Sequence, residues 1–265
     1  MSAEPPRVLL RVATYNLLHG IDLRTGRIDL EAACGAIAAL DADVVAIQEA
    51  DRGQARTGGI HQLTRLAQLL EWHSAFAPAL LGSPEDRWTT CPASRAEEAS
   101  EPAYGIGLLC RTPLRDPERR ALPGGGDGER RPGASPQKPG WDYEPRVALA
   151  AWVDAGGATV RITTTHLSYL PWRGVVQLRA AAAFASAGGG PAALLGDLNL
   201  PAWGARLALS GTAWTHAGGG PTYPAWSPRM QTDHLLITGG LRAHDVTVGH
   251  AATSDHLPLL ATLSY

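Results

Sequence analysis

The sequence predicts an α/β domain built on mixed β-sheets, and three observations support this. Over residues 7–70, short apolar runs alternate with amphipathic helical patterns in the order strand, helix, strand, helix. Further along, the apolar runs 147–153 and 159–165 flank Asp154-Ala-Gly-Gly, which is typical of a hairpin. Finally, the chain shows no repeat of fixed period and no clean linker. We therefore expect one domain over residues 7–265, preceded by a tail at residues 1–6.

Each expected element follows from a local pattern. Leu30, Ile37 and Leu40 recur at helical spacing after a candidate cap at Asp29, and residues 60–70 repeat that spacing, as does the region around residues 175–182. Short apolar, β-branched runs predict the strands 7–15, 43–49, 104–110, 147–153, 159–165, 192–195, 234–238 and 259–264.

Two stretches read as connections. Residues 82–102 are rich in proline, serine and charge, which predicts a loop. Residues 111–144 contain many glycines, prolines and charged residues of both signs, and they are too long for an ordinary connection. We expect this second stretch to be a long functional or disordered excursion.

The composition excludes several function classes. The 265 residues are 45% hydrophobic and 18% charged, which is enough apolar material for a sizeable core, and the net charge is -2. This charge disfavours a nucleic-acid coat protein or a polybasic membrane binder. No apolar run approaches the ~20 residues of a membrane span, residues 1–6 lack the pattern of a secretory signal, and three cysteines share no metal-binding spacing. We expect a cytoplasmic monomer without a membrane partner.

Polar residues close many of the predicted strands. They are Asn16, Glu49, His166, Asp197 with Asn199, and Asp255 with His256. Loops that leave strand ends can converge on one rim, where α/β proteins commonly carry their sites. Each residue has a structural alternative, such as an exposed strand end for Glu49, an Asx turn for Asp197 or a packed histidine for His166.

The polar strand-end residues fall in seven short sequence blocks, and the order of these blocks is more informative than any single residue. In chain order they are Thr14-Tyr-Asn16, Ile47-Gln-Glu49, Tyr104-Gly-Ile-Gly-Leu-Leu, Thr165-His-Leu167, Gly196-Asp-Leu-Asn199, Thr232-Asp-His234 and Ser254-Asp-His256. This order resembles the endonuclease/exonuclease/phosphatase superfamily, the DNase I-like metal-dependent phosphoesterases, from about residue 8 to the end. The resemblance implies a four-layer sandwich in which helices flank two packed mixed sheets. It leaves the substrate open, because such relatives cleave DNA, RNA ends, inositol phosphates, sphingomyelin and other phosphoesters.

The resemblance also implies roles for individual residues. Glu49 would be the principal ligand of Mg²⁺ or Mn²⁺, with Asp255 and Asn16 in or near its shell, and such hard cations suit oxygen ligands. Asp197 would orient or deprotonate the attacking water, and Asn199 would donate to a phosphate oxygen. A second metal near these two residues stays open.

Two histidines complete the implied site. His256 would contact the phosphate or act as a base, with Asp233 fixing its ring. His166 matches the histidine of DNase I-like and sphingomyelinase-like members, which acts on the leaving group or a phosphate oxygen. Abasic-site endonucleases carry a tyrosine there, so this chain departs from them.

Three further residues are candidates for substrate binding. Arg146 and Arg229 lie beside matched blocks and could meet phosphate, although solvated arginine is the plain alternative. Trp172, like other tryptophans near these blocks, could line a groove that stacks a base or an apolar group, or could simply pack in a loop.

These observations favour a divalent-metal-dependent hydrolase of phosphoesters, most readily a phosphodiesterase that works by in-line attack of an activated water. The alternatives are a DNA or RNA nuclease, a phosphomonoesterase of the inositol-phosphate type, and a catalytically silent binding module on the same fold. The expected partner is the phosphoester, with nucleic acid allowed but not required.

Overall fold

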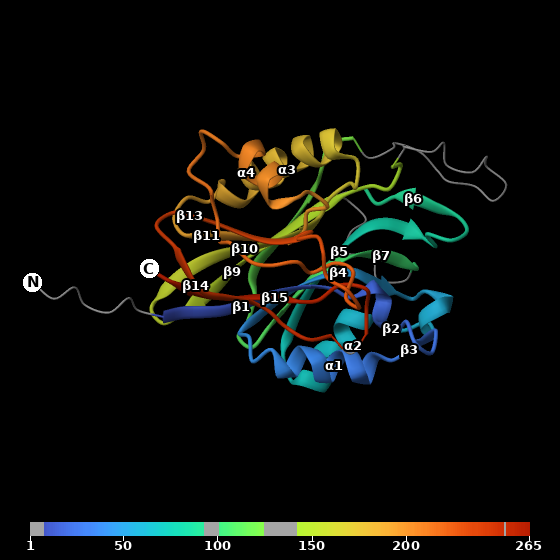
Figure 1. The fold of residues 1–265 in the computed structure, drawn as a ribbon. Helices are drawn as coiled ribbons and strands as arrows, with labels where there is room; N and C mark the ends of the chain where they lie inside the picture. Colours follow the sequence, from blue (N-terminus) through green and yellow to red (C-terminus); the bar gives the residue numbers. More distant parts are fainter. Residues whose placement is uncertain (1–7, 93–100, 125–141, 252) are drawn as a thin grey trace, which may run out of the picture.

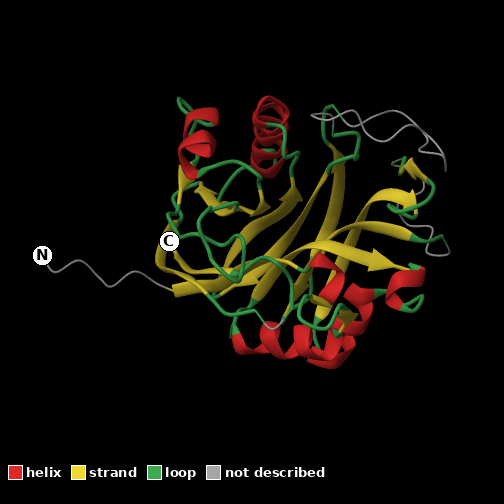
Figure 2. Ribbon diagram, turned by 45° about the vertical axis from the view of Figure 1, so that its right-hand side comes forward, coloured by secondary structure: helices red, strands yellow, loops and turns green. Residues whose placement is uncertain are grey.

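Two β-sheets pack face to face, and helices cover the outer face of each (Figure 1). The computed structural model describes residues 8–92, 101–124, 142–251 and 253–265. The predicted tail at residues 1–6 lies outside these ranges. Within them, the helix–sheet–sheet–helix arrangement confirms the expected four-layer α/β sandwich (Figure 2).

The first sheet contains the first and the last strand of the described chain, β1 and β15, side by side. Its strands are β1 (Val8–Asn16), β4 (Val44–Arg52), β5 (His73–Gly82), β6 (Trp88–Thr90), β7 (Ala103–Cys110), β14 (Arg242–Val248) and β15 (Leu259–Ser264), in the spatial order β14-β15-β1-β4-β7-β5-β6. Only β1 and β4 run parallel among its described strands. A small ribbon of β2 (Ile21–Asp22) and β3 (Arg27–Ile28) stands apart from this sheet.

The second sheet has a similar plan. Its strands are β8 (Arg115–Ala121), β9 (Val147–Ala155), β10 (Ala158–His166), β11 (Ala192–Asp197), β12 (Thr215–His216) and β13 (Asp233–Thr238), in the spatial order β12-β13-β11-β10-β9-β8. Here β10 and β11 form the parallel pair of the described strands. Each sheet therefore has one central parallel pair flanked by antiparallel neighbours.

Helices cover the outer faces in two pairs. The first sheet carries α1 (Leu30–Ala39) and α2 (Gln62–Leu70), and the second carries α3 (Pro171–Ser186) and α4 (Ala202–Ala208), with two short 3₁₀ turns at Leu18–Gly20 and Ala55–Thr57. The Asp29 side chain accepts a hydrogen bond from the Ala32 amide, as its predicted cap role requires. No helix of the described ranges is both long and apolar enough to cross a membrane.

The core lies between the two sheets. It is made of small and branched apolar side chains that point inward from both, including Val12, Ala46, Leu108, Ile162 and Leu195. The buried side chain of Gln48 links the two sheets. Gln48 on β4 donates to the Thr164 hydroxyl on β10 at 3.0 Å and accepts from the Thr14 hydroxyl on β1 at 3.2 Å. These bonds satisfy a buried amide and fix how the sheets sit on each other.

The sheet registers bring the polar strand ends to one edge. Asn16 pairs with Gln48 across β1 and β4, and His166 pairs with Asp197 across β10 and β11. Asp233 begins the antiparallel β13 directly opposite Asp197. Parallel partners end together and an antiparallel neighbour starts there, so this edge collects residues that are far apart in the sequence.

The structure corrects several sequence predictions. Residues 115–121, predicted to lie in a long excursion, form the edge strand β8, and Trp88–Thr90 forms β6 within the predicted loop 82–102. The strand β5, the helix α4 and the strands β12 and β14 carried no strong pattern and were not predicted. β8 and β14 lie at sheet edges, where the residues of β8 are almost all exposed and those of β14 are exposed or only half-buried, so neither gives a strong apolar period. Residues 125–141 of the predicted excursion lie outside the described ranges.

Gly196 permits close approach of two strands immediately before Asp197. Its φ is +154°, and a Cβ at this position would lie 1.9 Å from the Thr165 carbonyl oxygen on the paired strand β10. That contact is shorter than any real one, and the atom it meets is backbone. Only glycine therefore fits where β10 and β11 deliver His166 and Asp197 side by side.

We predict that Gly196→Ala destabilises the protein by about 1–3 kcal/mol, because the two strands must separate to admit the methyl group. Gly35→Ala is the matched control, since a Cβ there meets nothing within 4 Å and the residue lies inside α1. That control should stabilise the protein by about 0.5–1 kcal/mol. Urea denaturation measures both, and equal stability of the two variants would contradict the steric argument.

Candidate active site

The polar strand ends surround a cavity of about 420 Å³ at the shared edge of the two sheets. Seven predicted site residues line it, namely Glu49, Arg146, His166, Asp197, Asn199, Asp255 and His256. The other lining residues are Tyr104, Asp142, Glu144, Tyr169, Tyr223, Met230 and Thr232. A cavity of this size is within the usual range for a small-molecule site.

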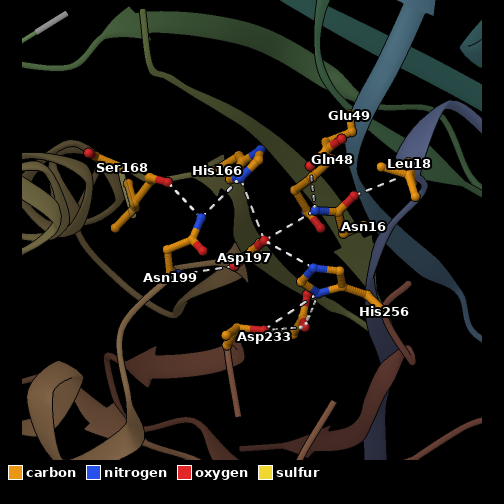
Figure 3. Close-up of polar contacts among 12 residues, drawn as sticks. Asn16, Leu18, Gln48, Glu49, His166, Ser168, Asp197, Asn199, Asp233 and His256 are labelled. Atoms are coloured by element: carbon orange, nitrogen blue, oxygen red, sulfur yellow. Dashed lines mark hydrogen bonds and ion pairs between the residues drawn. The ribbon is translucent and has the colours of Figure 1, made fainter. Parts of the chain in front are cut away.

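Asn16 lies behind this cavity and joins the two sheets (Figure 3). Its side-chain amide donates to Oε1 of Glu49 at 3.0 Å and to Oδ2 of Asp197 at 3.1 Å, and its Oδ1 accepts from the Leu18 amide at 3.1 Å. Because these bonds use both amide hydrogens and the carbonyl, Asn16 positions two carboxylates. Asn16 does not line the cavity, and it contacts the predicted metal ligand Glu49 directly.

A β-bulge aims Glu49 at the cavity. The pairing of β4 with β7 shifts between Ile47 and Ala50, and Glu49 has a φ of 56°. Such a conformation is strained for a residue with a side chain, and strain of this kind clusters at functional sites. Burial raises the pKa of Glu49, and the neighbouring Asp255 carboxylate raises it further, against the hydrogen bond from Asn16.

Asp233 and His256 form a buried pair on the second side of the cavity. Nδ1 of His256 lies 2.8 Å from Oδ2 of Asp233, which also accepts from the hydroxyls of Thr222 at 2.6 Å and Thr232 at 3.1 Å. Burial alone would lower the pKa of His256, but the carboxylates of Asp233, Asp197 and Asp255 outweigh it and raise the pKa to about 10. The ring is therefore an imidazolium in the metal-free protein at neutral pH.

Asp197 lies between two imidazole rings of different charge. Its Oδ2 is 3.5 Å from Nε2 of His166 and 3.7 Å from Nε2 of His256 (Figure 3). Burial, followed by Arg146 and His256, lowers the pKa of His166 well below its ordinary value. Burial and the nearby Asp233 raise the pKa of Asp197 to about 7. The cavity thus offers a carboxylate, a cationic ring and a neutral ring within a few ångströms, which suits acid–base chemistry near neutral pH.

Comparison with known proteins gives the same picture. The family model described as "Endonuclease/Exonuclease/phosphatase family" matches residues 13–256. The chain belongs to this family. No curated protein matches the sequence.

Solved structures share the fold at low sequence identity. A family member from Beutenbergia cavernae is 22% identical with a TM-score of 0.73, over 97% of this chain and 72% of that one. A mannosyl-6-phosphatase from Bacteroides thetaiotaomicron is 15% identical with a TM-score of 0.66, over 97% and 100%. A humanized D. rerio TDP2 is 14% identical with a TM-score of 0.62, over 97% and 99%. These likenesses show the DNase I-like fold, and the family identifies the chain as a phosphoesterase at the coarse level.

The family generally uses divalent metals, and the residues present fit such an ion. The Glu49 and Asp255 carboxylates both line the cavity and interact electrostatically. Oδ1 of Asp255 is buried and has no hydrogen-bond donor within the described residues. Two converging carboxylates with a free buried oxygen are what a hard cation requires. Asp197, Asp233 and His256 also have ligand atoms within 4.8 Å of one another. Three donors reach Oδ2 of Asp233, its Oδ1 has no hydrogen-bond partner within the described residues, and Asp233 does not line the cavity.

Asn199 is held more tightly than the sequence predicted. Its amide donates to the Leu167 carbonyl at 2.9 Å and lies 3.2 Å from Nε2 of His166, while its backbone amide donates to Oδ1 of Asp197 at 3.0 Å. Its φ of 50° belongs to the turn that ends β11. Asn199 therefore fixes the His166 ring and the Asp197 carboxylate. Its side-chain amide already contacts His166 and the Leu167 carbonyl within the protein.

Two predicted substrate-binding residues lie elsewhere. Trp172 is at the start of α3 with 63% of its surface exposed, and Arg229 is exposed on the loop before β13. Neither lines the cavity. Trp172, Trp203 and Trp226 all face solvent and do not line this cavity, although their sequence positions adjoin the site, and Trp141 lies outside the described residues.

Sequence reasoning missed the polar wall made by Tyr104, Asp142 and Glu144. A signal was present, since Asp142-x-Glu144-x-Arg146 alternates charge immediately before a strand. Thr222, which supports Asp233, carried no signal. His234 follows Asp233 but faces away from the cavity, with its Nε2 2.8 Å from the Leu200 carbonyl oxygen.

We predict that Asp233→Asn lowers the pKa of His256 from about 10 toward its ordinary 6.5 in the metal-free protein. The raised pKa contributes stability that is fully present below pH 6.5 and is lost as the pH rises through about 10. The stability difference between wild type and Asp233→Asn should therefore be about 3 kcal/mol or more near neutral pH and shrink at high pH. NMR titration of the ring gives the pKa, and urea denaturation at several pH values gives the stability. A His256 ring that titrates near 6.5 in both proteins would show that Asp233 does not govern it.

Proposed function

We propose that this protein is a divalent-metal-dependent phosphoester hydrolase that acts most readily on phosphodiesters. The observation that carries the proposal is the convergence of Glu49 and Asp255 beside Asp197, His166 and the Asp233–His256 pair in one cavity. Phosphoryl transfer needs a placed water and compensation of charge on the phosphate oxygens, and these groups provide both. Membership of the family supports the coarse activity.

Each residue of the cavity has a distinct role in the proposed reaction. Glu49 and Asp255 would hold Mg²⁺ or Mn²⁺, which when bound would stabilise the charge that develops on the non-bridging oxygens. Asp197 accepts a proton from the attacking water. The water oxygen bonds to phosphorus while the bond between phosphorus and the leaving oxygen, on the opposite side, breaks. The leaving oxygen takes a proton from solvent, to which Asp197 later returns its own. The His256 imidazolium neutralises a phosphate oxygen, His166 and Asn199 line the same wall, and Asn16 and Asp233 act as positioning residues.

The alternatives differ in substrate or in activity. A phosphomonoesterase is favoured by the mannosyl-6-phosphatase among the structural neighbours, and a nuclease or phosphodiesterase keeps the same chemistry. A silent binding module would be favoured by a missing site residue, but Asn16, Glu49, Asp197, Asn199, Asp233 and His256 are all present. An active hydrolase is therefore favoured over a catalytically silent binding module.

We predict that chelation abolishes hydrolysis of a generic phosphodiester and that Mg²⁺ or Mn²⁺, but not Ca²⁺ alone, restores it. Glu49→Gln should keep the fold and lower kcat/KM by at least about 100-fold, since it removes charge at a metal ligand without changing volume. The matched control is Glu31→Gln on the exposed face of α1, which should behave as wild type. Full activity of Glu49→Gln in excess chelator would refute metal dependence.

We also predict that a small phosphodiester is hydrolysed in preference to duplex DNA, whose cleavage should be weak and without sequence preference. The net charge is -2, and the cavity wall is rich in carboxylates, so little positive charge is available to neutralise several phosphates. Parallel assays at about 50 and about 200 mM salt cover the range in which phosphate contacts reveal themselves. Efficient DNA cleavage that collapses at the higher salt, with no hydrolysis of the small ester, would identify a nuclease instead.

A further inference from the structure

Two histidines form a hydrogen-bonded chain on the face of β13 that is turned away from the cavity. Asp233 and His234 are neighbours on β13, so their side chains point to opposite faces of the sheet. His234 is fully buried, and the centre of its ring lies 5.0 Å from that of the half-buried His216 on β12. Neither ring takes part in the proposed reaction.

Each ring nitrogen of the pair has a hydrogen-bond partner. Nε2 of His234 lies 2.8 Å from the Leu200 carbonyl oxygen, and its Nδ1 lies 2.8 Å from Nε2 of His216. Nδ1 of His216 lies 3.0 Å from the backbone nitrogen of Gly218. The chain therefore runs from the 197–200 turn, through both rings, to the segment after β12.

The two ends of this chain fix where the ring protons lie. A carbonyl oxygen only accepts, so Nε2 of His234 carries a proton, and the Gly218 amide only donates, so Nδ1 of His216 carries none. His216 must then carry its proton on Nε2, which leaves Nδ1 of His234 as the acceptor between the rings. Both rings are therefore neutral and of the same tautomer, and every bond of the chain is donated in one direction.

The surroundings of the pair favour these neutral forms. Burial, followed by His234 and Arg206, lowers the pKa of His216 to about 4. Burial also lowers the pKa of His234, against the Leu200 carbonyl and the Asp233 carboxylate, which raise it. At neutral pH neither ring therefore carries the extra proton that would break the chain.

The carbonyl of Leu200 depends on this donor. Leu200 is buried, and no backbone amide of the described residues donates to its carbonyl, because the first helical bond of α4 runs from the Ala205 amide to Pro201. A buried carbonyl without a donor is costly. His234 removes that cost and ties the end of the turn to β13.

The turn that ends at Leu200 carries two residues of the cavity. Asp197 ends β11, and the backbone amide of Asn199 donates to its Oδ1 at 3.0 Å. A shift of the Leu200 carbonyl moves the residue directly after Asn199. We propose that His216 and His234, each neutral with its proton on Nε2, are positioning residues that hold this turn in place for the reaction. The proposal rests on the proposed function, because it gives both rings a part in that reaction.

Matched variants of His216 test the proposal by kinetics. His216→Phe keeps a ring of similar size but removes the donor to His234, so kcat for a small phosphodiester in the metal-loaded protein should fall by at least about tenfold, with KM changed less than about threefold. The amide of His216→Gln reaches as far as Nε2 and can donate to the same nitrogen, so this variant should keep kcat within about threefold of wild type. His244→Phe is the control, since it removes a histidine hydrogen bond to Ser264 on the edge strand β14 and should leave kcat unchanged. Thermal unfolding verifies that each variant is folded.

NMR of the metal-free protein tests the same proposal without turnover. Near neutral pH, the ring nitrogens of His216 and His234 should both show the neutral tautomer with the proton on Nε2. His216→Phe should shift the backbone amide resonance of Asn199, whereas His244→Phe should leave it in place.

The outcomes separate this proposal from the proposed function. A proton on Nδ1 of either ring in the wild type would overturn the histidine chain, and so would wild-type kcat in folded His216→Phe. A His216→Gln variant that loses as much kcat as His216→Phe, or an Asn199 amide that does not respond to His216→Phe, would also overturn it. If His216→Phe does not fold, the wild-type tautomers and the kcat of His216→Gln decide. A metal-loaded wild type that hydrolyses no phosphoester would instead overturn the proposed function, and the catalytic part of this proposal with it.

Discussion

The site depends on one buried amide. Asn16 stands at the end of β1 and gives its two amide hydrogens to carboxylates that belong to different sheets, Glu49 on β4 and Asp197 on β11. Burial raises the pKa of both carboxylates, and the hydrogen bond from Asn16 acts against that rise in each. The Ser254 hydroxyl donates to the backbone carbonyl of Asn16 from the loop that carries Asp255 and His256. One residue thus couples both sheets and the last catalytic loop.

Around this amide, negative charge is distributed so that each carboxylate has a different environment. Asp233 is fully buried and its Oδ2 accepts from two threonine hydroxyls and from His256. Glu49 has a single amide donor, and one oxygen of Asp255 has none among the described residues. Oδ1 of Asp233 also accepts no hydrogen bond within the described residues, so the supply of donors alone does not distinguish these carboxylates. Their positions do, because Glu49 and Asp255 line the cavity, whereas Asp233 lies behind it against His256.

The fold and most of the site could be predicted from the sequence, for identifiable reasons. Buried strands such as β4 and β11 are apolar runs that end in a charged residue, and the convergence of their ends follows from parallel pairing. Edge strands such as β8 have no buried face, so their residues carry no period. Trp172 misled because adjacency in sequence does not say which way a side chain points, and on α3 it points to solvent. Tyr104, Asp142 and Glu144 needed the three-dimensional arrangement of β7 and β9 to be seen together.

The residues of the cavity come from two kinds of backbone, the central strands and the irregular segment before β9. Asn16, Glu49, His166 and Asp197 sit within or at the ends of central strands, where sheet register holds them and any shift disturbs the core between the layers. Asp142, Glu144 and Arg146 belong to the chain before β9, which lies outside any helix or strand. Changes there alter charge and hydrogen bonding at the cavity wall without moving a strand. The sheets thus hold the cluster of site residues in place, while the segment that enters β9 shapes one wall of the cavity.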